Sequence, residues 1–223
     1  MTTRAVSPNV ESALRIVSLL EPGERQLVPD VKWDEYEQLL EELSDHAVRI
    51  SYTEGVLELM GPLYRHEKYK DFVLRAVAIL TRALGLKLES GGSTTLKHKE
   101  LKRGAEPDTC FYIQHAAHMI GKETIDLKTD PPPDIVVEID ITSPPYGKLD
   151  IYAHLGVPEL WRYDGKQFRI FELLAGTYIE REASVTFPRL TGRDMQSFIE
   201  QCDRQGQDAA LESVQEWASK QKV

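Results

Sequence analysis

The 223-residue sequence contains only two cysteines, Cys110 and Cys202, and no long uninterrupted hydrophobic segment. Two cysteines cannot build a disulfide framework or a cysteine-rich zinc site. No apolar run approaches the roughly 18 to 20 residues that a membrane-spanning helix needs. The first residues also lack a signal-peptide pattern, because their short apolar run is interrupted and ends in charged residues. We therefore expect a cytoplasmic protein without a membrane partner.

Positive charge is scarce as well. The chain has 27 lysines and arginines against 36 aspartates and glutamates, a formal net charge of −9. Binding to nucleic acid through bulk electrostatics is not expected, since neutralising phosphates requires Lys and Arg. An enzyme that contacts nucleic acid locally is still compatible with this charge, because metal ions can supply positive charge at the scissile bond.

One basic cluster stands out in the segment LKHKELKRG. Its members are Lys97, His98, Lys99, Lys102 and Arg103. Such a run is typical of a solvent-exposed hairpin. The alternative interpretation is a weak nucleic-acid contact through the lysines and the arginine.

The remaining composition is that of a globular protein, with 41% hydrophobic and 28% charged residues. Hydrophobic spacing predicts helices at 8–20, 33–45, 64–84, 148–155 and 192–204, and an exposed terminal helix within 207–223. It predicts strands at 48–52, 56–60, 86–90, 109–113, 135–141, 159–163, 168–173 and 177–180. Because helices and strands do not alternate strictly, we expect an α/β (α+β) fold with a mixed β-sheet flanked by helices. The expected divisions are an N-terminal helical extension (1–30), a main domain (31–205) and a C-terminal helical tail (206–223).

The segment PPPDIVVEIDITSPPYGKLDIY, residues 131–152, places two carboxylates in an otherwise apolar strand. Successive strand residues point to opposite faces, so Glu138 and Asp140 share one face, about 7 Å apart along the strand. One or two carboxylates, completed by waters and phosphate oxygens, form the environment that Mg²⁺ prefers. The alternatives are a sheet face open to water, or an Asp140 that caps the following loop.

Lys148 follows this strand in a short predicted helix. At about 100° per residue, Lys148 lies in the same arc as Ile151 and Tyr152, which is apolar. A lysine in such an arc either extends its ammonium to solvent or turns inward toward carboxylates. For the inward arrangement, Lys148→Met is expected to remove a charge that stabilises a transition state while thermal stability stays nearly unchanged.

Two further segments carry polar residues at the starts of predicted elements. Asp108 follows Pro107 at the beginning of a strand, where an aspartate most often serves as a turn residue. His66 and Glu67 open the long helix, and His66 lies on the same face as Tyr69. A core histidine and a histidine beside a functional site are both compatible with this position.

These segments occur together, in the same order, in a known family. The chain resembles the Uma2 family (DUF820), restriction endonuclease-like proteins of the PD-(D/E)XK nuclease superfamily. The resemblance covers about Trp33 to Glu200. It is carried by GVLELMGP with His66 after it, EPDTCFYI, PPPDIVVEIDITSP, KLDIYAHLGVPELWRYD and FELLAGTYIE. It implies a restriction endonuclease-like core, a mixed sheet between helices.

The resemblance also implies catalytic roles. Asp108 and Glu138 match the acidic pair that holds Mg²⁺ or Mn²⁺, and Lys148 matches the catalytic lysine. The superfamily places that lysine two residues after the glutamate, where this chain has Asp140. As in Uma2 proteins, the lysine comes instead from the next helix.

The same resemblance implies supporting residues. Asp140 would tune the lysine or hold a second ion, and His66 would lie beside the site. Superfamily members often add an acidic residue from an early helix, for which Glu67 is the candidate and Glu58 a weaker one.

The sequence therefore predicts a metal-dependent endonuclease that acts on DNA. A homodimer is expected as well, because nucleases of this fold often pair to cut two strands. The alternative is a catalytically inactive module of the same fold that associates with nucleic acid or protein. Hydrolysis of RNA would use the same residues, so the sequence does not separate RNA from DNA.

Overall fold

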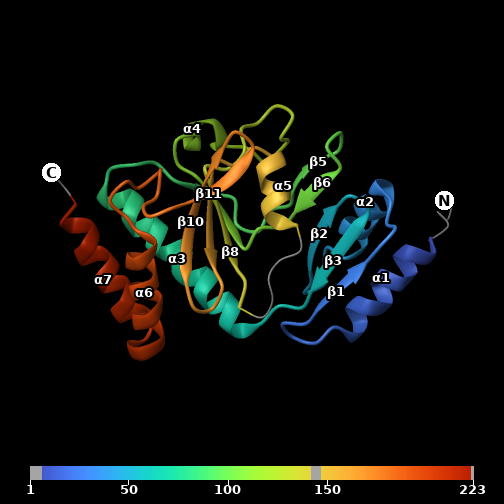
Figure 1. Ribbon diagram of the computed structural model, residues 1–223, viewed down its shortest axis with the longest axis horizontal. Helices are drawn as coiled ribbons and strands as arrows, with labels where there is room; N and C mark the ends of the chain where they lie inside the picture. The colour runs from blue at the N-terminus through green and yellow to red at the C-terminus, as the bar shows by residue number, and fades with distance from the viewer. Residues whose placement is uncertain (1–6, 142–146, 222–223) are drawn as a thin grey trace.

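The computed structural model describes residues 7–141 and 147–221. The start of the expected N-terminal extension (1–6), the loop before Lys148 (142–146) and the end of the expected tail (222–223) lie outside the described residues. The described chain forms two β-sheets with helices packed around them, and the two termini lie at opposite ends of the long axis (Figure 1).

The secondary structure follows the predicted order with several additions. The helices are α1 (Pro8–Leu19), α2 (Trp33–Glu42), α3 (Tyr64–Ala83), α4 (Ala116–Met119), α5 (Lys148–His154), α6 (Gly192–Gln205) and α7 (Gln207–Ser219). The first sheet has the spatial order β1 (Arg25–Val28), β3 (Val56–Met60), β2 (Arg49–Thr53), β6 (Arg103–Ala105) and β5 (Leu96–His98). The second sheet has the order β11 (Thr177–Arg181), β10 (Phe168–Leu174), β9 (Glu159–Tyr163), β8 (Ile135–Ile139), β7 (Thr109–Tyr112) and β4 (Glu89–Ser90).

The first sheet is antiparallel throughout and carries its own core. Glu54 and Gly55 join β2 to β3 with φ angles of 49° and 86°, the conformation of a tight hairpin turn that matches the strand twist. Tyr36 from α2 stacks on Tyr52 from β2, with ring centroids 5.0 Å apart. This packing holds the backbone of β2 in place, and with it the side chains on the opposite face of the strand.

The second sheet is mixed, because β8 and β9 run parallel while the other pairs are antiparallel. Helices α3, α6 and α7 bury one of its faces in the largest hydrophobic cluster. Helix α5, which connects β8 to β9, covers the other face together with residues of β5 and β6. In Figure 1, α5 therefore lies between the two sheets.

The predicted mixed sheet flanked by helices is confirmed, with two corrections. The structure has two sheets, and residues 25–28 of the expected helical extension supply the edge strand β1 of the first. The expected exposed terminal helix is wrong, because Ala210, Val214 and Ala218 of α7 are fully buried against the core. Small residues at four-residue spacing make a weak hydrophobic signal, yet they let two helices pack closely.

None of the helices in the described part of the chain combines the length and hydrophobicity needed to cross a bilayer.

Candidate active site

Two acidic residues occupy neighbouring backbone positions where β7 and β8 pair. Thr109 of β7 is opposite Val137 of β8, and Asp108 and Glu138 each lie one residue beyond this pair. The Asp108 amide also donates a hydrogen bond to the Val137 carbonyl over 3.2 Å. Because cross-strand neighbours share a face of the sheet, the antiparallel register brings the two acidic side chains to the same side.

Asp108 is buried and is held by three groups. Its carboxylate accepts a 2.5 Å hydrogen bond from the Ile139 amide and lies 2.8 Å from Nε2 of His66. Arg49, from β2 of the first sheet, forms an ion pair with its other oxygen. The Asp108 side chain is only 1% exposed, so the Ile139 amide and the positive charge of Arg49 offset part of the cost of burying the carboxylate.

Glu138 is equally buried and has a separate pair of donors. Lys148 Nζ lies 2.7 Å from one carboxylate oxygen, and the Tyr152 hydroxyl donates to the other over 2.5 Å. Both donors come from α5, one turn apart. Burial and the neighbouring Glu138 charge raise the pKa of Tyr152 well above its ordinary value, so the phenol stays protonated as a donor.

The start of α5 explains why Lys148 turns inward. Gly147 precedes it in the left-handed conformation, with φ of 64°, and a side chain there would sit 3.0 Å from Thr53 Cγ2 of β2. A glycine allows this backbone conformation at close range. Lys148 is buried with Ile151 and Tyr152, as the helical arc predicted, and its ammonium contacts Glu138.

His66 and Glu67 also reach this region from the first turn of α3. Burial, reinforced by the charge of Arg49, lowers the pKa of His66 to about 3, so His66 is neutral at physiological pH. Burial opposes ionisation of Glu67, but hydrogen bonds from Lys70 and Arg49 outweigh it and lower the pKa of Glu67 to about 2. Arg49 therefore bridges Asp108 and Glu67, which is 2.7 Å from its other nitrogen.

Asp140 has a different partner from the one expected. Its carboxylate accepts a 2.8 Å hydrogen bond from Arg162 Nε of β9. Burial and the nearby charge of Glu138 raise the pKa of Asp140 to about 7, against the opposing influence of Lys148 and Arg162. The weaker candidate Glu58 pairs with Arg25 at 3.3 Å.

The basic segment is not part of this cluster. Arg103 is buried and pairs with Glu54 at 2.9 Å and Asp150 at 3.3 Å. Lys97 and Lys99 each lie 3.6 Å from a carboxylate oxygen of Glu37 on α2. Lys102 is exposed, in the turn of the β5–β6 hairpin. Much of the positive charge in this segment is therefore already neutralised within the protein.

Sequence patterns did not identify two charged residues of the site, Arg49 and Glu106. Arg49, Ser51 and Thr53 form a polar face of β2, because they alternate with apolar residues along the strand. This polar face is the sequence pattern from which Arg49 could have been found. Glu106 accepts hydrogen bonds of 3.1 Å from the Ile50 amide and from the Thr95 hydroxyl. Burial raises the pKa of Glu106, and the positive charges of Arg49 and Lys148 oppose this increase.

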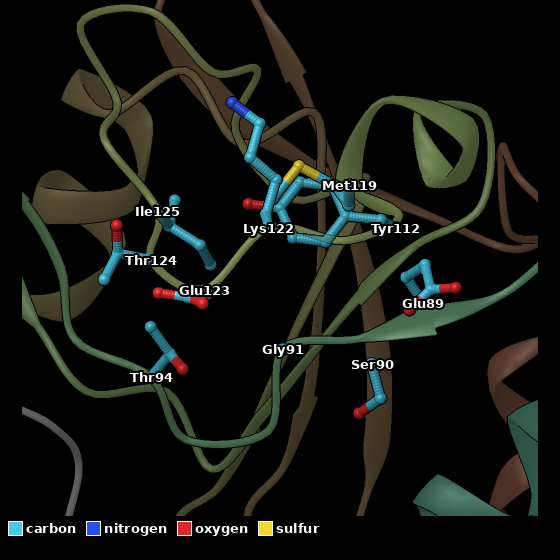
Figure 2. A pocket seen from close by; sticks show the side chains of 10 residues that line it. All are labelled: Glu89, Ser90, Gly91, Thr94, Tyr112, Met119, Lys122, Glu123, Thr124 and Ile125. Atoms are coloured by element: carbon cyan, nitrogen blue, oxygen red, sulfur yellow. The ribbon is translucent and has the colours of Figure 1, made fainter.

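A separate pocket lies at the far end of β7, four residues from Asp108. Its volume is about 170 Å³, and Tyr112, Met119 and Ile125 form its apolar wall (Figure 2). Lys122 points away from the other side chains in Figure 2, and its amine contacts Asp130 at 2.6 Å. None of the predicted site residues lines this pocket, so it is distinct from the carboxylate pair.

The donor set around Asp108 and Glu138 fits a hard divalent cation. Mg²⁺ is commonly bound by one or two carboxylates, with waters and substrate phosphates as the remaining ligands. Among residues 7–141 and 147–221, no group of three acidic, histidine or cysteine side chains is arranged to hold a metal. A cation at this place would therefore depend on the two carboxylates plus water or substrate oxygens.

Comparisons with known proteins bear on the family and the fold. The model of the Uma2 family, described as "Putative restriction endonuclease", matches residues 33–199. A search of curated proteins found no match. The fold is similar to that of a solved structure from Anabaena variabilis ATCC 29413, described as "a putative nuclease belonging to DUF820". The two chains are 15% identical, with a TM-score of 0.50 over 75% of this chain and 98% of the other.

The family match spans well over half of the chain and includes Asp108, Glu138 and Lys148. The chain therefore belongs to the Uma2 family.

Proposed function

We propose that this protein is a metal-dependent endonuclease that hydrolyses phosphodiester bonds in DNA. The observation that carries the proposal is the buried arrangement of Asp108 beside Glu138, with Lys148 Nζ 2.7 Å from the glutamate. The family description and the name of the structural neighbour, both of which refer to nucleases, support the same reaction class.

Asp108 and Glu138 are the residues that would hold Mg²⁺ or Mn²⁺. When bound, the cation supplies Lewis-acid stabilisation of the phosphate and makes a water molecule more acidic. The Ile139 amide, 2.5 Å from Asp108, and the Tyr152 hydroxyl, 2.5 Å from Glu138, fix the orientation of the two carboxylates. Such outer contacts keep the ligand oxygens in place while substrate enters and leaves.

Lys148 provides the positive charge for the transition state. In the hydrolysis, a water oxygen forms a bond to phosphorus and the bond from phosphorus to a sugar oxygen breaks. The attacking water gives its proton to solvent, and the departing sugar oxygen takes up a proton from solvent. Negative charge builds up on the phosphate oxygens, and an ammonium held inside the protein stabilises it. Glu138 positions this ammonium through the 2.7 Å contact.

The remaining predicted residues have supporting roles in this proposal. His66 is neutral and contacts Asp108, and Glu67 anchors Arg49. Asp140 pairs with Arg162 next to Glu138. Lys97, Lys99 and Lys102, with Arg103 beneath them, make at most a weak nucleic-acid contact, since three of the four are paired with carboxylates.

The direct test is cleavage of plasmid and linear DNA with Mg²⁺ or Mn²⁺. We expect cleavage with either ion, no cleavage in EDTA, and no cleavage by Asp108→Asn. An RNA substrate of the same sequence, measured in parallel, separates the two nucleic acids. Absence of cleavage of every substrate, together with absence of metal binding, would refute the proposal.

A catalytically inactive module is the second candidate. It is favoured by the fact that Asp108 and Glu138 are already neutralised by Arg49 and Lys148. Isothermal titration with Mn²⁺ separates the two candidates, because an enzyme must bind the ion through its carboxylates and an inactive module need not. Binding that is lost in both Asp108→Asn and Glu138→Gln favours the enzyme.

We also propose that the protein works as a homodimer, which would place two such sites on the two strands of DNA. Light scattering of the purified protein is the measurement, and a monomer at micromolar concentration would contradict it.

A further inference from the structure

Arg49 has no function in the mechanism proposed above, although it lies at the centre of the site. It comes from β2 of the first sheet, whereas Asp108 lies beside β7 of the second. Its guanidinium pairs with Asp108 and reaches Glu67 over 2.7 Å. The Arg49 side chain is 11% exposed, so this bridge is largely shielded from water.

This contact puts Arg49 in direct conflict with a divalent cation. A cation on Asp108 needs carboxylate oxygens, which here are used by Arg49, His66 and the Ile139 amide. The amide and the neutral histidine are compatible with a positive ion nearby, but a guanidinium repels it. Of the described groups that contact Asp108, Arg49 is therefore the one that carries the opposing charge.

Glu67 gives the arginine a second partner. The Glu67 side chain is 43% exposed and already lies 2.7 Å from Arg49. Arg49 can therefore leave Asp108 and keep one carboxylate contact, so its charge is not left buried without a counter-ion. Glu106 adds negative charge close to the same guanidinium.

We infer that Arg49 is an internal counter-ion of Asp108 that competes with the divalent cation for this carboxylate. The inference rests on the proposed function, because it takes Asp108 as a metal ligand. Arg49 keeps the buried aspartate neutralised until a cation arrives, and is then released toward Glu67. Arg49 is thus a positioning residue that sets the metal affinity of the site.

Calorimetric titration with Mn²⁺ of wild type, Arg49→Gln and Asp108→Asn tests this inference. We expect Arg49→Gln to bind Mn²⁺ about tenfold more tightly than wild type, because the competing charge is gone. A residue that only supports the structure would give the opposite sign or no change when removed. Unchanged or weaker binding in Arg49→Gln would overturn the inference.

Arg103→Gln is the matched control. Arg103 is also a buried arginine, on the neighbouring strand β6, and also pairs with two carboxylates. Its removal should leave Mn²⁺ affinity within about twofold of wild type, since neither partner is a proposed ligand. An equal gain in Arg103→Gln would show that any lost cation tightens binding, and would also overturn the inference.

Thermal melting provides a second readout that does not require activity. Without metal, Arg49→Gln should melt below wild type, and Mn²⁺ should raise its melting temperature more than that of wild type. Arg49→Lys keeps the positive charge but lacks the planar guanidinium that contacts two carboxylates at once. Its melting behaviour should therefore lie between that of wild type and that of Arg49→Gln. If Arg49→Gln does not fold, Arg49→Lys becomes the test variant. A Mn²⁺ affinity of Arg49→Lys that is no higher than that of wild type then contradicts the inference.

The outcomes separate this inference from the proposed function. If wild type and Asp108→Asn bind Mn²⁺ equally, Asp108 is not a ligand and the proposed function fails. If Asp108→Asn alone loses binding while Arg49→Gln equals wild type, the proposed function stands and the competition is refuted.

Discussion

Lys148 and Glu138 form an ion pair of 2.7 Å in which neither side chain is more than 5% exposed. A buried pair of this kind is costly to break from one side, because the remaining charge is left without its partner. The pair therefore links the proposed chemistry to the stability of the fold. It also changes the expectation for Lys148→Met, for which helical spacing alone predicted nearly unchanged thermal stability.

Lys148→Met should abolish detectable DNA cleavage and lower the free energy of unfolding by about 3 to 5 kcal/mol. The loss of stability arises because Glu138 would keep, among the described residues, only the Tyr152 hydroxyl as a side-chain donor. The double variant Lys148→Met with Glu138→Gln removes both charges and should recover most of the stability without recovering cleavage. Urea denaturation and a plasmid-nicking assay measure the two effects. Full activity of Lys148→Met would show that the lysine is not catalytic.

Tyr152→Phe should have a milder effect of the same kind. It removes the 2.5 Å hydrogen bond to Glu138 but leaves the Lys148 contact intact. We expect a loss of about 1 to 3 kcal/mol in the free energy of unfolding, the cost of an unsatisfied buried acceptor. Cleavage should fall less than in Lys148→Met. A stability equal to that of wild type would mean that this hydroxyl contributes little to holding Glu138.

Asp130 should make part of the stability depend on pH. The Asp126 amide at 2.9 Å, Lys122 at 2.6 Å and His118 at 3.0 Å hold the pKa of Asp130 well below its ordinary value. A carboxyl whose pKa is depressed on folding stabilises the protein above the unfolded-state pKa, about 3.9, and this contribution is lost as the pH falls below it. Asp130→Asn should therefore be less stable than wild type at neutral pH.

The difference between Asp130→Asn and wild type should shrink toward pH 3. Urea midpoints measured from pH 7 downward give both curves, and other carboxyls titrate equally in the two proteins. A constant difference across this range would contradict the prediction.

Gly104→Ala should destabilise the contact between α2 and β6. A side chain at this position would clash with the Tyr36 hydroxyl and lie 2.9 Å from the Tyr36 ring carbon that bears it. Tyr36 is fully buried against Tyr52, so it cannot move without disturbing the aromatic cluster. We expect a loss of about 1 to 3 kcal/mol, the usual cost of overpacking. Calorimetric melting measures it, and Gly104→Ala with Tyr36→Phe should recover part of the loss.

Local patterns in the sequence were sufficient to place Glu138 and Lys148. Side chains of the strand 135–139 point alternately to its two faces, which predicted the face of Glu138. The apolar arc of α5 predicted that Lys148 points inward, and the contact between the two residues agrees with both predictions. Both follow from periodicities of a single element, which neighbouring residues determine.

The pairing of Asp140 with Arg162 could not be predicted from alternation. Glu138 and Asp140 are on the same face by spacing, but Asp140 follows the end of β8 and meets Arg162 of the adjacent strand. Which cation faces which carboxylate depends on the parallel pairing of β8 with β9. That pairing brings together residues separated by a helix, and no local pattern specifies it.

By itself the sequence determined most of the helices and strands and the faces on which Glu138 and Lys148 lie, because these depend on residue type and on spacing within one strand or helix. Only the tertiary structure decided that the chain forms two sheets, that α7 is buried, and that Arg49 of the first sheet contacts Asp108 of the second. The physical reason is that such contacts join elements distant in the sequence, and their charge balance exists only after both sheets have packed around α5.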